Sequence, residues 1–415
     1  MRSSRRVRSS RETKSDLSDL AVFGGVPAFS SSLHVGRPNI GNRKRLLDRI
    51  RDVLDRRWLT NQGPLVQEFE SEICKLLSAK RCIATCNATT ALEIVIRALN
   101  LTGEVIVPSF TFIATAHALQ WQEITPVFCD IDPETHNLDP ACVESLITPR
   151  TTGILATHIW GRPCAVDALY EIAARNDLKL VFDAAHAFSC SYRGQKIGNF
   201  GAAEVFSFHA TKFLNTFEGG AVVTNDDELA NKIRLMTNFG FTGYDSVMYL
   251  GINGKMSEPA AAMGLTGLEC VNEFIATNRN HYKHYLRALA DIPGVNLVQY
   301  DEAEENNYQY IVLEIDETKT NISRDLIASV LHAENILARR YFFPGCHRME
   351  PYRSYFPHAR LLLPETEKLT QRVLSLPTGT AVDTHDVDVV CELIRFLIRR
   401  GGDLSRKIFT LPANR

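Results

Sequence analysis

Two short segments, Leu178-Lys-Leu-Val-Phe-Asp-Ala-Ala-His186 and Ala203-Glu-Val-Phe-Ser-Phe-His-Ala-Thr-Lys212, indicate the fold of this chain. Each contains an apolar run typical of a buried strand, and an ionisable side chain, Asp183 or Lys212, follows each run. Open α/β sheets bind ligands beyond the carboxyl ends of their strands. The two segments therefore predict an α/β fold in which Asp183 and Lys212 share one ligand site.

Asp183 and Lys212 also fit the requirements of one cofactor, pyridoxal phosphate. This cofactor needs an amine that forms a Schiff base, and a carboxylate that keeps the pyridine nitrogen protonated so that the ring accepts electrons. Lys212 is the candidate amine and Asp183 is the candidate carboxylate. The alternative is structural, because most lysines are solvated and an aspartate after a strand commonly forms a turn or caps a helix.

The composition is that of an ordinary globular protein. The 415 residues, 45% of them hydrophobic and 23% charged, allow two domains and a sizeable core. The formal net charge of −2 gives no overall attraction to nucleic acid, and no apolar run approaches the length that spans a bilayer. The ten cysteines are scattered, and the close pair Cys82 and Cys86 has no second pair at zinc spacing. We therefore expect a cytoplasmic protein with reduced thiols and no metal site.

The chain starts with a basic segment, Met1 to Lys14, which is rich in Arg and Ser and lacks the apolar core of a secretion signal. We expect a disordered tail over residues 1–19 and a second tail over residues 403–415. Two alternatives for the first tail remain open. It also resembles an organelle transit peptide, and a basic tail can bind nucleic acid or an acidic partner.

Short apolar runs alternate with helical patterns along the middle of the chain, which predicts a mostly parallel sheet covered by helices. The expected strands are Glu104–Val107, Thr125–Cys129, Gly153–Ala156, Leu178–Phe182, Ala203–Ser207 and Ala221–Thr224. A long helical pattern then precedes Pro293-Gly294, after which the pattern changes to short strands and helices. We expect a large domain over residues 20–290 and a smaller α+β domain over residues 291–402.

Ser207-Phe-His-Ala-Thr-Lys212, followed by Phe217-Glu-Gly-Gly220, resembles the DegT/DnrJ/EryC1/StrS family of nucleotide-sugar aminotransferases. Four more segments are similar to the family in the same order: Pro108–Thr115, Pro126–Asp132, Asn253–Glu258 and Arg372–Pro377. The resemblance covers roughly residues 20–399. It implies an aspartate aminotransferase type fold (fold type I), a homodimer with shared active sites, and glutamate as the amino donor.

The resemblance also implies roles around the cofactor. Lys212 would move a proton between the substrate carbon and the cofactor, and burial would lower the pKa of its amine. Asp183 would pair with the pyridine nitrogen. His186 would lie near the phenolic oxygen, where many relatives have glutamine, and Phe112 would stack on the pyridine ring.

The phosphate of the cofactor is expected at the start of the helical pattern Asn87–Leu92, because a helix N-terminus favours an anion. Ala88 and Thr89 match the Gly-Thr pair of the family, and Ala88 in place of glycine requires a backbone outside the left-handed region. Ser207 would add a hydroxyl, and Asn253 would reach the phosphate from the partner subunit. A plain helix cap is the alternative for the first segment.

Three residues are the candidates for contact with the sugar substrate: His347 and Tyr352 in the segment Pro344–Tyr352, and His158 after a predicted strand. Each also fits a purely structural role. Lys255 stands where many relatives have arginine, and a lysine cannot form a bidentate fork.

The predicted function follows from the less common segments, Ser18–Gly25, Cys86–Thr89, Trp160–Cys164 and Pro344–His347. They are similar to members that transfer an amino group from glutamate to C4 of dTDP-4-keto-6-deoxyglucose. The alternatives are transfer to C3 or to another nucleotide-linked keto sugar. A dehydratase of the family would carry histidine in place of Lys212, and a non-catalytic regulator would lack Lys212, Asp183 or the phosphate-binding hydroxyls.

Overall fold

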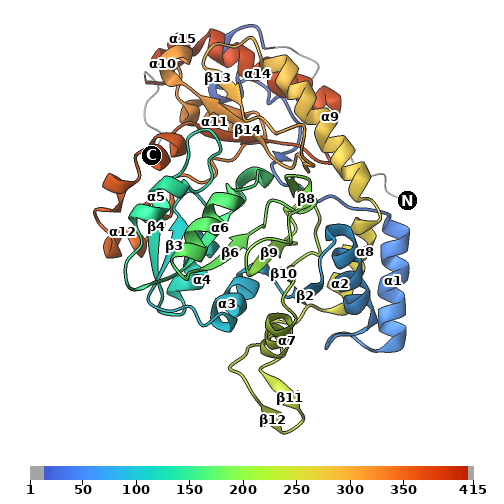
Figure 1. The fold of residues 1–415 in the computed structure, drawn as a ribbon. Coiled ribbons are helices and arrows are strands. Elements are labelled where there is room, and N and C mark those ends of the chain that lie inside the picture. The colour runs from blue at the N-terminus through green and yellow to red at the C-terminus, as the bar shows by residue number, and fades with distance from the viewer. Residues whose placement is uncertain (1–13, 410–415) are drawn as a thin grey trace.

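A seven-stranded sheet forms the centre of the large domain in the computed structural model, which describes residues 14–409 (Figure 1). Its strands lie in the order β2-β10-β9-β6-β5-β3-β4. Their bounds are β2 Arg81–Thr85, β3 Glu104–Pro108, β4 Thr125–Cys129, β5 Thr151–Thr157, β6 Lys179–Asp183, β9 Ala203–Ser207 and β10 Gly220–Thr224. The predicted α/β fold with a mostly parallel sheet is therefore confirmed.

The six expected strands are all present, whereas β2 was not predicted. β10 is antiparallel to both of its neighbours, β2 and β9. The reason lies in the connection from β9 to β10, residues 208–219, because it contains no helix that could carry the chain back for a parallel pairing. This same connection contains Lys212.

Helices cover both faces of the large sheet. Side chains that alternate along each strand therefore pack into two apolar layers, one on each face. Val105 and Val107 pack with helices α3, α4 and α7, whereas Ile106 packs with α5 and α6 on the opposite face. Their bounds are α3 Ala88–Ala98, α4 Ile113–Gln120, α5 Pro140–Ser145, α6 Val166–Arg175 and α7 Asp227–Met236. Helices α1 Arg43–Arg56, α2 Pro64–Leu77 and α8 Glu258–Leu268 pack together beside β2.

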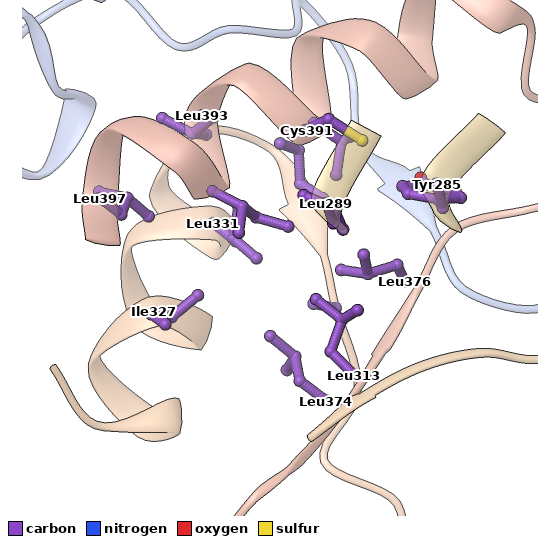
Figure 2. Packing of buried hydrophobic residues seen from close by; sticks show 14 of the residues in the cluster. Tyr285, Leu289, Leu313, Ile327, Leu331, Leu374, Leu376, Cys391, Leu393 and Leu397 are labelled. Carbon is purple, nitrogen blue, oxygen red and sulfur yellow. The ribbon is translucent and has the colours of Figure 1, made fainter. Parts of the chain in front are cut away.

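The long helix α9, Val271–Leu289, connects this body to a second, smaller layer. A three-stranded antiparallel sheet, β13 Val295–Leu297, β14 Ile311–Ile315 and β16 Val373–Leu376, is covered by α11 Arg324–Ala333 and α14 Thr384–Arg399. Figure 2 shows Leu313 and Leu374 of this sheet on the side of Leu331 in α11, and the α14 residue Leu393 belongs to the same buried cluster. The domain boundary between residues 290 and 291 stays a prediction.

The remaining elements are short. They are β1 Leu33–His34, β7 Ser191–Tyr192, β8 Gln195–Lys196, β11 Phe241–Gly243, β12 Ser246–Val247, α10 Glu317–Thr320, β15 Ile336–Leu337, α12 Tyr352–Tyr355, α13 Pro364–Thr370 and α15 Gly401–Phe409. The 3-10 turns are Leu17–Asp19, Ala21–Phe23, Ile159–Gly161, Cys346–Arg348 and Ala359–Leu362. The β11–β12 hairpin projects from the body below α7 (Figure 1).

Described residues from both predicted tails pack against the rest of the chain. Lys14 forms an ion pair of 3.2 Å with Glu334, and Leu17 is only 5% exposed within the apolar cluster of the small sheet. At the other end Leu404 of α15 is buried in the same cluster. Apolar burial orders both segments. Residues 1–13 and 410–415, and with them most of the predicted basic tail, lie outside the described residues.

Within residues 14–409 no helix is both long enough and apolar enough to cross a membrane. No group of three or more His, Cys, Asp or Glu side chains in that range could hold a metal ion. The ten cysteines are all free thiols.

Candidate active site

One cavity of about 720 Å³ opens at the carboxyl ends of the parallel strands. Its size is typical of a small-molecule site. Its wall includes seven residues that the sequence analysis assigned to the cofactor: Ala88, Thr89, Phe112, Asp183, His186, Ser207 and Lys212. Gln309, Tyr310 and Arg339 close the cavity from the side of the small sheet.

Lys212 lies in the loop between β9 and β10, and the buried residues Phe213 and Leu214 anchor the chain directly after it. Its Nζ donates to Tyr310 Oη at 3.4 Å. Burial lowers the pKa of the Lys212 amine to about 8, although the nearby Asp183 carboxylate opposes this change. A much larger fraction of the amine is therefore neutral near pH 8 than for an exposed lysine.

Asp183 is the last residue of β6, and its carboxylate is buried. Oδ1 accepts from the Ala185 amide at 3.0 Å, and Oδ2 accepts from Thr115 Oγ1 at 2.8 Å. Burial raises the pKa of the carboxyl, whereas the two donors and the charge of Lys212 lower it. The carboxylate is thus held in one orientation by neighbours on different elements.

His186 forms part of an aromatic wall of the cavity. Its Nδ1 accepts from the Trp160 amide at 3.3 Å, and its ring centroid lies 4.4 Å from that of Tyr310. Burial and the charge of Lys212 place the pKa of His186 well below its usual value. The ring is therefore neutral at physiological pH and carries its proton on Nε2, because Nδ1 is an acceptor.

The opposite end of the cavity is suited to an anion. Ala88 and Thr89 are the first residues of α3, and the Asn87 side chain caps this helix by accepting from the Thr90 amide at 2.8 Å. Ala88 has no left-handed backbone, as its side chain requires. Gly220 lies so close that a Cβ atom there would be 2.6 Å from the Ala88 amide nitrogen. The amides of the first turn can therefore bind a phosphate at the cavity wall.

Ser207 and Phe112 complete the predicted cofactor wall. Ser207 ends β9 and pairs with Gly220 of β10. Phe112 immediately precedes α4 and is 58% exposed, although phenylalanine in an apolar segment is usually buried. An exposed ring that lines a cavity can stack on a flat ligand.

Asn253 is the one predicted cofactor residue that does not line this cavity. It is exposed and pairs across the backbone with Asn238. The next residue, Gly254, accepts a hydrogen bond from the Cys86 amide at 2.7 Å, just before the start of α3. Lys255 donates to Asn238 Oδ1 at 2.8 Å. The predicted contact from the partner subunit remains a proposal.

The three predicted substrate residues do not line this cavity, and their contact with the sugar stays a prediction. His347 bonds through Nδ1 to Ser109 Oγ at 2.7 Å and through Nε2 to Glu367 at 2.6 Å. Tyr352 is buried among apolar residues, and its hydroxyl lies 2.8 Å from a nitrogen of His117. Ser109 directly follows β3, His117 lies in α4 and Glu367 lies in α13.

His158 has the contacts of a structural residue. It is buried, stacks on Phe182 with ring centroids 4.7 Å apart, and bonds to Glu204 at 3.1 Å and to the Cys164 amide at 2.9 Å. Both ring nitrogens are therefore occupied by protein partners.

Several residues that line the cavity were not predicted as site residues, namely Thr111, Thr157, Gln309, Tyr310, Arg339 and Phe342. Tyr310 lies in the region where the sequence analysis expected only short strands and helices of the small domain. Thr111 lies inside the segment Pro108–Thr115, so its motif was noticed while its contact was not. The others have no local signal, because they reach the cavity from distant parts of the chain.

Most of the chain is similar to a known family of aminotransferases. The sequence model described as the DegT/DnrJ/EryC1/StrS aminotransferase family matches residues 41–395. A curated relative from Escherichia coli, named dTDP-4-amino-4,6-dideoxy-D-glucose transaminase, is 33% identical over 366 residues, which is 88% of this chain and 98% of the relative. A GDP-perosamine synthase from Caulobacter vibrioides is 33% identical over 376 residues, 88% of this chain and 98% of its own.

A solved structure is more similar still. The crystal structure of DesI, determined in the presence of its TDP-sugar product, superimposes with a TM-score of 0.91 and is 52% identical. The match covers 95% of this chain and 100% of DesI. PseC from Helicobacter pylori, an aminotransferase of pseudaminic acid biosynthesis, superimposes with a TM-score of 0.82 at 27% identity, covering 88% of this chain and 99% of that one.

Proposed function

The chain belongs to the DegT/DnrJ/EryC1/StrS aminotransferase family, and on this basis we propose that it transfers an amino group from glutamate to C4 of dTDP-4-keto-6-deoxyglucose. The product is dTDP-4-amino-4,6-dideoxyglucose. The observation that carries the proposal is the meeting of Lys212 and Asp183 in one cavity. The names of the E. coli relative and of the DesI structure support the choice of the acceptor sugar.

The residues of the cavity fit pyridoxal phosphate. The start of α3 and the Ser207 hydroxyl suit its phosphate, the exposed Phe112 ring suits its flat face, and the Asp183 carboxylate suits its ring nitrogen. When bound, the cofactor supplies an aldehyde that condenses with amines and a ring that accepts electrons. Lys212 would hold it covalently.

Lys212 is also the candidate general base. A base works best when its pKa is close to the working pH, and burial brings the Lys212 amine to about 8. Its Nζ would take a proton from the substrate carbon that bears the amino group and return one to the other substrate in the second half reaction. Tyr310 Oη, 3.4 Å away, would keep the amine oriented between these two steps.

We propose further that two copies of the chain form a dimer with shared active sites. The β11–β12 hairpin and its flanks expose an apolar set that is typical of an interface: Phe239, Phe241, Tyr244, Val247, Met248, Leu250 and Ile252. The hairpin projects from the body (Figure 1), and the exposed Asn253 follows it directly. A partner covering this surface would bring Asn253 of one subunit to the phosphate of the other.

The visible absorption spectrum of the purified protein tests the reaction. We expect a cofactor band that glutamate bleaches and that dTDP-4-keto-6-deoxyglucose restores, and we expect no such band in Lys212→Ala. Absence of the band from the natural protein would contradict the cofactor assignment. Bleaching that this sugar fails to reverse would retain the amino transfer and refute the acceptor.

Mixing two inactive variants tests the shared site. A hybrid of Lys212→Ala and Asn253→Ala contains one intact site if Asn253 acts on the partner, so random reassortment should restore about a quarter of the natural activity. No recovery, in a mixture that demonstrably exchanges subunits, would show that Asn253 does not serve the partner. Static light scattering of each variant alone provides the control for assembly.

A further inference from the structure

We propose that Thr157, Thr111 and Thr115 form a directed chain of hydroxyl groups that keeps the Asp183 carboxylate ionised and oriented for the cofactor. This inference rests on the proposed function, because the carboxylate needs a partner in the cavity. Thr115, which does not line the cavity, is a positioning residue that acts through Asp183, and Thr111 and Thr157 act on Asp183 through Thr115.

The chain connects three separate elements. Thr157 is the last residue of β5, Thr111 lies in the loop before α4, and Thr115 is in the first turn of α4. Thr157 Oγ1 lies 3.2 Å from Thr111 Oγ1, which lies 3.1 Å from Thr115 Oγ1, which in turn lies 2.8 Å from Asp183 Oδ2. All four side chains are buried. Thr115 is fully buried and does not line the cavity, so its contact with Asp183 is shielded from solvent.

The direction of the chain follows from counting protons. Each hydroxyl has one proton to donate, and an ionised carboxylate can only accept. Thr115 must therefore donate to Asp183, which leaves Thr111 to donate to Thr115 and Thr157 to donate to Thr111. The three dipoles then point the same way, toward the negative charge. A protonated Asp183 would instead compete to donate to Thr115, so the arrangement favours the ionised form.

The Thr115 hydroxyl bonds to a side chain on another element rather than to the backbone of its own segment. A threonine inside a helix commonly bonds to the carbonyl one turn earlier, and for Thr115 that carbonyl belongs to Thr111. The Thr111 carbonyl instead accepts from Cys346 Sγ at 3.4 Å, while the Thr115 hydroxyl reaches Asp183 on the neighbouring element. The sequence places this hydroxyl 68 positions from its acceptor. Local helix geometry alone therefore does not explain the contact.

The chain opposes the effect of burial. Removing the Asp183 carboxylate from water raises its pKa, and the Thr115 hydroxyl is one of the groups that lower it again. Lys212 and His158 also act on this carboxyl through their charges, and Tyr310 and Cys164 are the other titratable groups that sense it. Thr115 does not line the cavity, so its hydroxyl can influence a bound cofactor only through Asp183.

The test measures the affinity of the cofactor-free protein for pyridoxal phosphate as a function of pH, by quenching of tryptophan fluorescence. Affinity should fall on the acid side as Asp183 becomes protonated. Thr115→Val removes one hydrogen bond to a charged group, so we expect about tenfold weaker cofactor binding at neutral pH. The pH midpoint of the fall in affinity on the acid side should rise by about one pH unit. Thr111→Val should shift the midpoint in the same direction by less.

Two matched variants separate this effect from packing. Thr115→Ser keeps the hydroxyl and should restore the natural midpoint. Thr370→Val removes a buried hydroxyl that donates to the Glu367 carbonyl oxygen, and it should leave the midpoint unchanged. An unshifted midpoint in Thr115→Val, or a shift that Thr115→Ser does not reverse, would overturn the proposal. Failure of the natural protein to bind the cofactor would instead refute the proposed function.

Discussion

Replacing Lys212 by methionine should stabilise the cofactor-free protein, and the gain should depend on pH. Burial lowers the pKa of the Lys212 amine from its usual 10.5 to about 8. Below about pH 8 the amine is charged in both the folded and the unfolded chain, so folding must bury a charge. Methionine has a similar length and no charge, so it removes this cost.

The magnitude follows from the change in pKa. At ~1.36 kcal/mol per pH unit, the fall from 10.5 to about 8 corresponds to a cost of about 3 kcal/mol at pH 7. Between about pH 8 and 10.5 the unfolded chain binds a proton that the folded chain has released, so the stability of the natural protein rises with pH in this window. The advantage of Lys212→Met should therefore decrease by roughly 2–3 kcal/mol from pH 7 to pH 10.

Urea unfolding of both cofactor-free proteins, followed by circular dichroism at several pH values, measures this difference. Altered packing changes the free energy of unfolding by the same amount at every pH. It therefore shifts the whole plot of the stability difference against pH without changing its slope. Lys212→Gln, which has no titrating amine, should give a curve of the same slope. A stability difference that stays constant from pH 7 to pH 10 would refute the reasoning, because Lys212 would then titrate alike in the folded and unfolded chain.

Two further substitutions test the assignment of residues to the site and to the scaffold. Gly220→Ala places a Cβ atom 2.6 Å from the Ala88 amide nitrogen, so α3 must shift and cofactor affinity should fall at least about tenfold. Gly402→Ala, which meets nothing within 4 Å, is its control, and equal affinities in a binding titration would contradict the phosphate site. His158→Ala removes the contact with Glu204 and should lower the free energy of unfolding by roughly 2–4 kcal/mol without raising KM for the sugar. A raised KM at unchanged stability would return His158 to the substrate site.

The positions of six strands along the chain, and the two ionisable candidates Asp183 and Lys212, could be predicted because their signals are local. Asp183 and Lys212 each follow an apolar run of five residues or fewer. Such runs can be recognised in the sequence without knowing what packs on them. β2 was missed because its apolar residues follow the charged pair Lys80 and Arg81, which gives a weaker pattern. The antiparallel direction of β10 follows from the absence of a helix between β9 and β10. The residue pattern of one strand does not indicate the direction of its pairing.

The substrate residues could not be assigned in the same way. The segment around His347 has the residues of a binding loop, yet its imidazole is enclosed by Ser109 and Glu367. Whether a histidine faces a cavity or a protein partner depends on residues far away in the chain. The same holds in reverse for Tyr310, which reads as an ordinary strand residue and reaches Lys212 across 98 positions.

The sequence by itself determined the kind of fold and the family, and it indicated Asp183 and Lys212 as candidate site residues, because periodicity and motifs are carried by neighbouring positions. Only the tertiary structure decided which polar side chains surround those two residues. The Thr115 hydroxyl and the Tyr310 phenol approach Asp183 and Lys212 because separate elements pack around one sheet edge. Burial there moves the pKa of both groups, and burial is a property of the packed chain rather than of any segment.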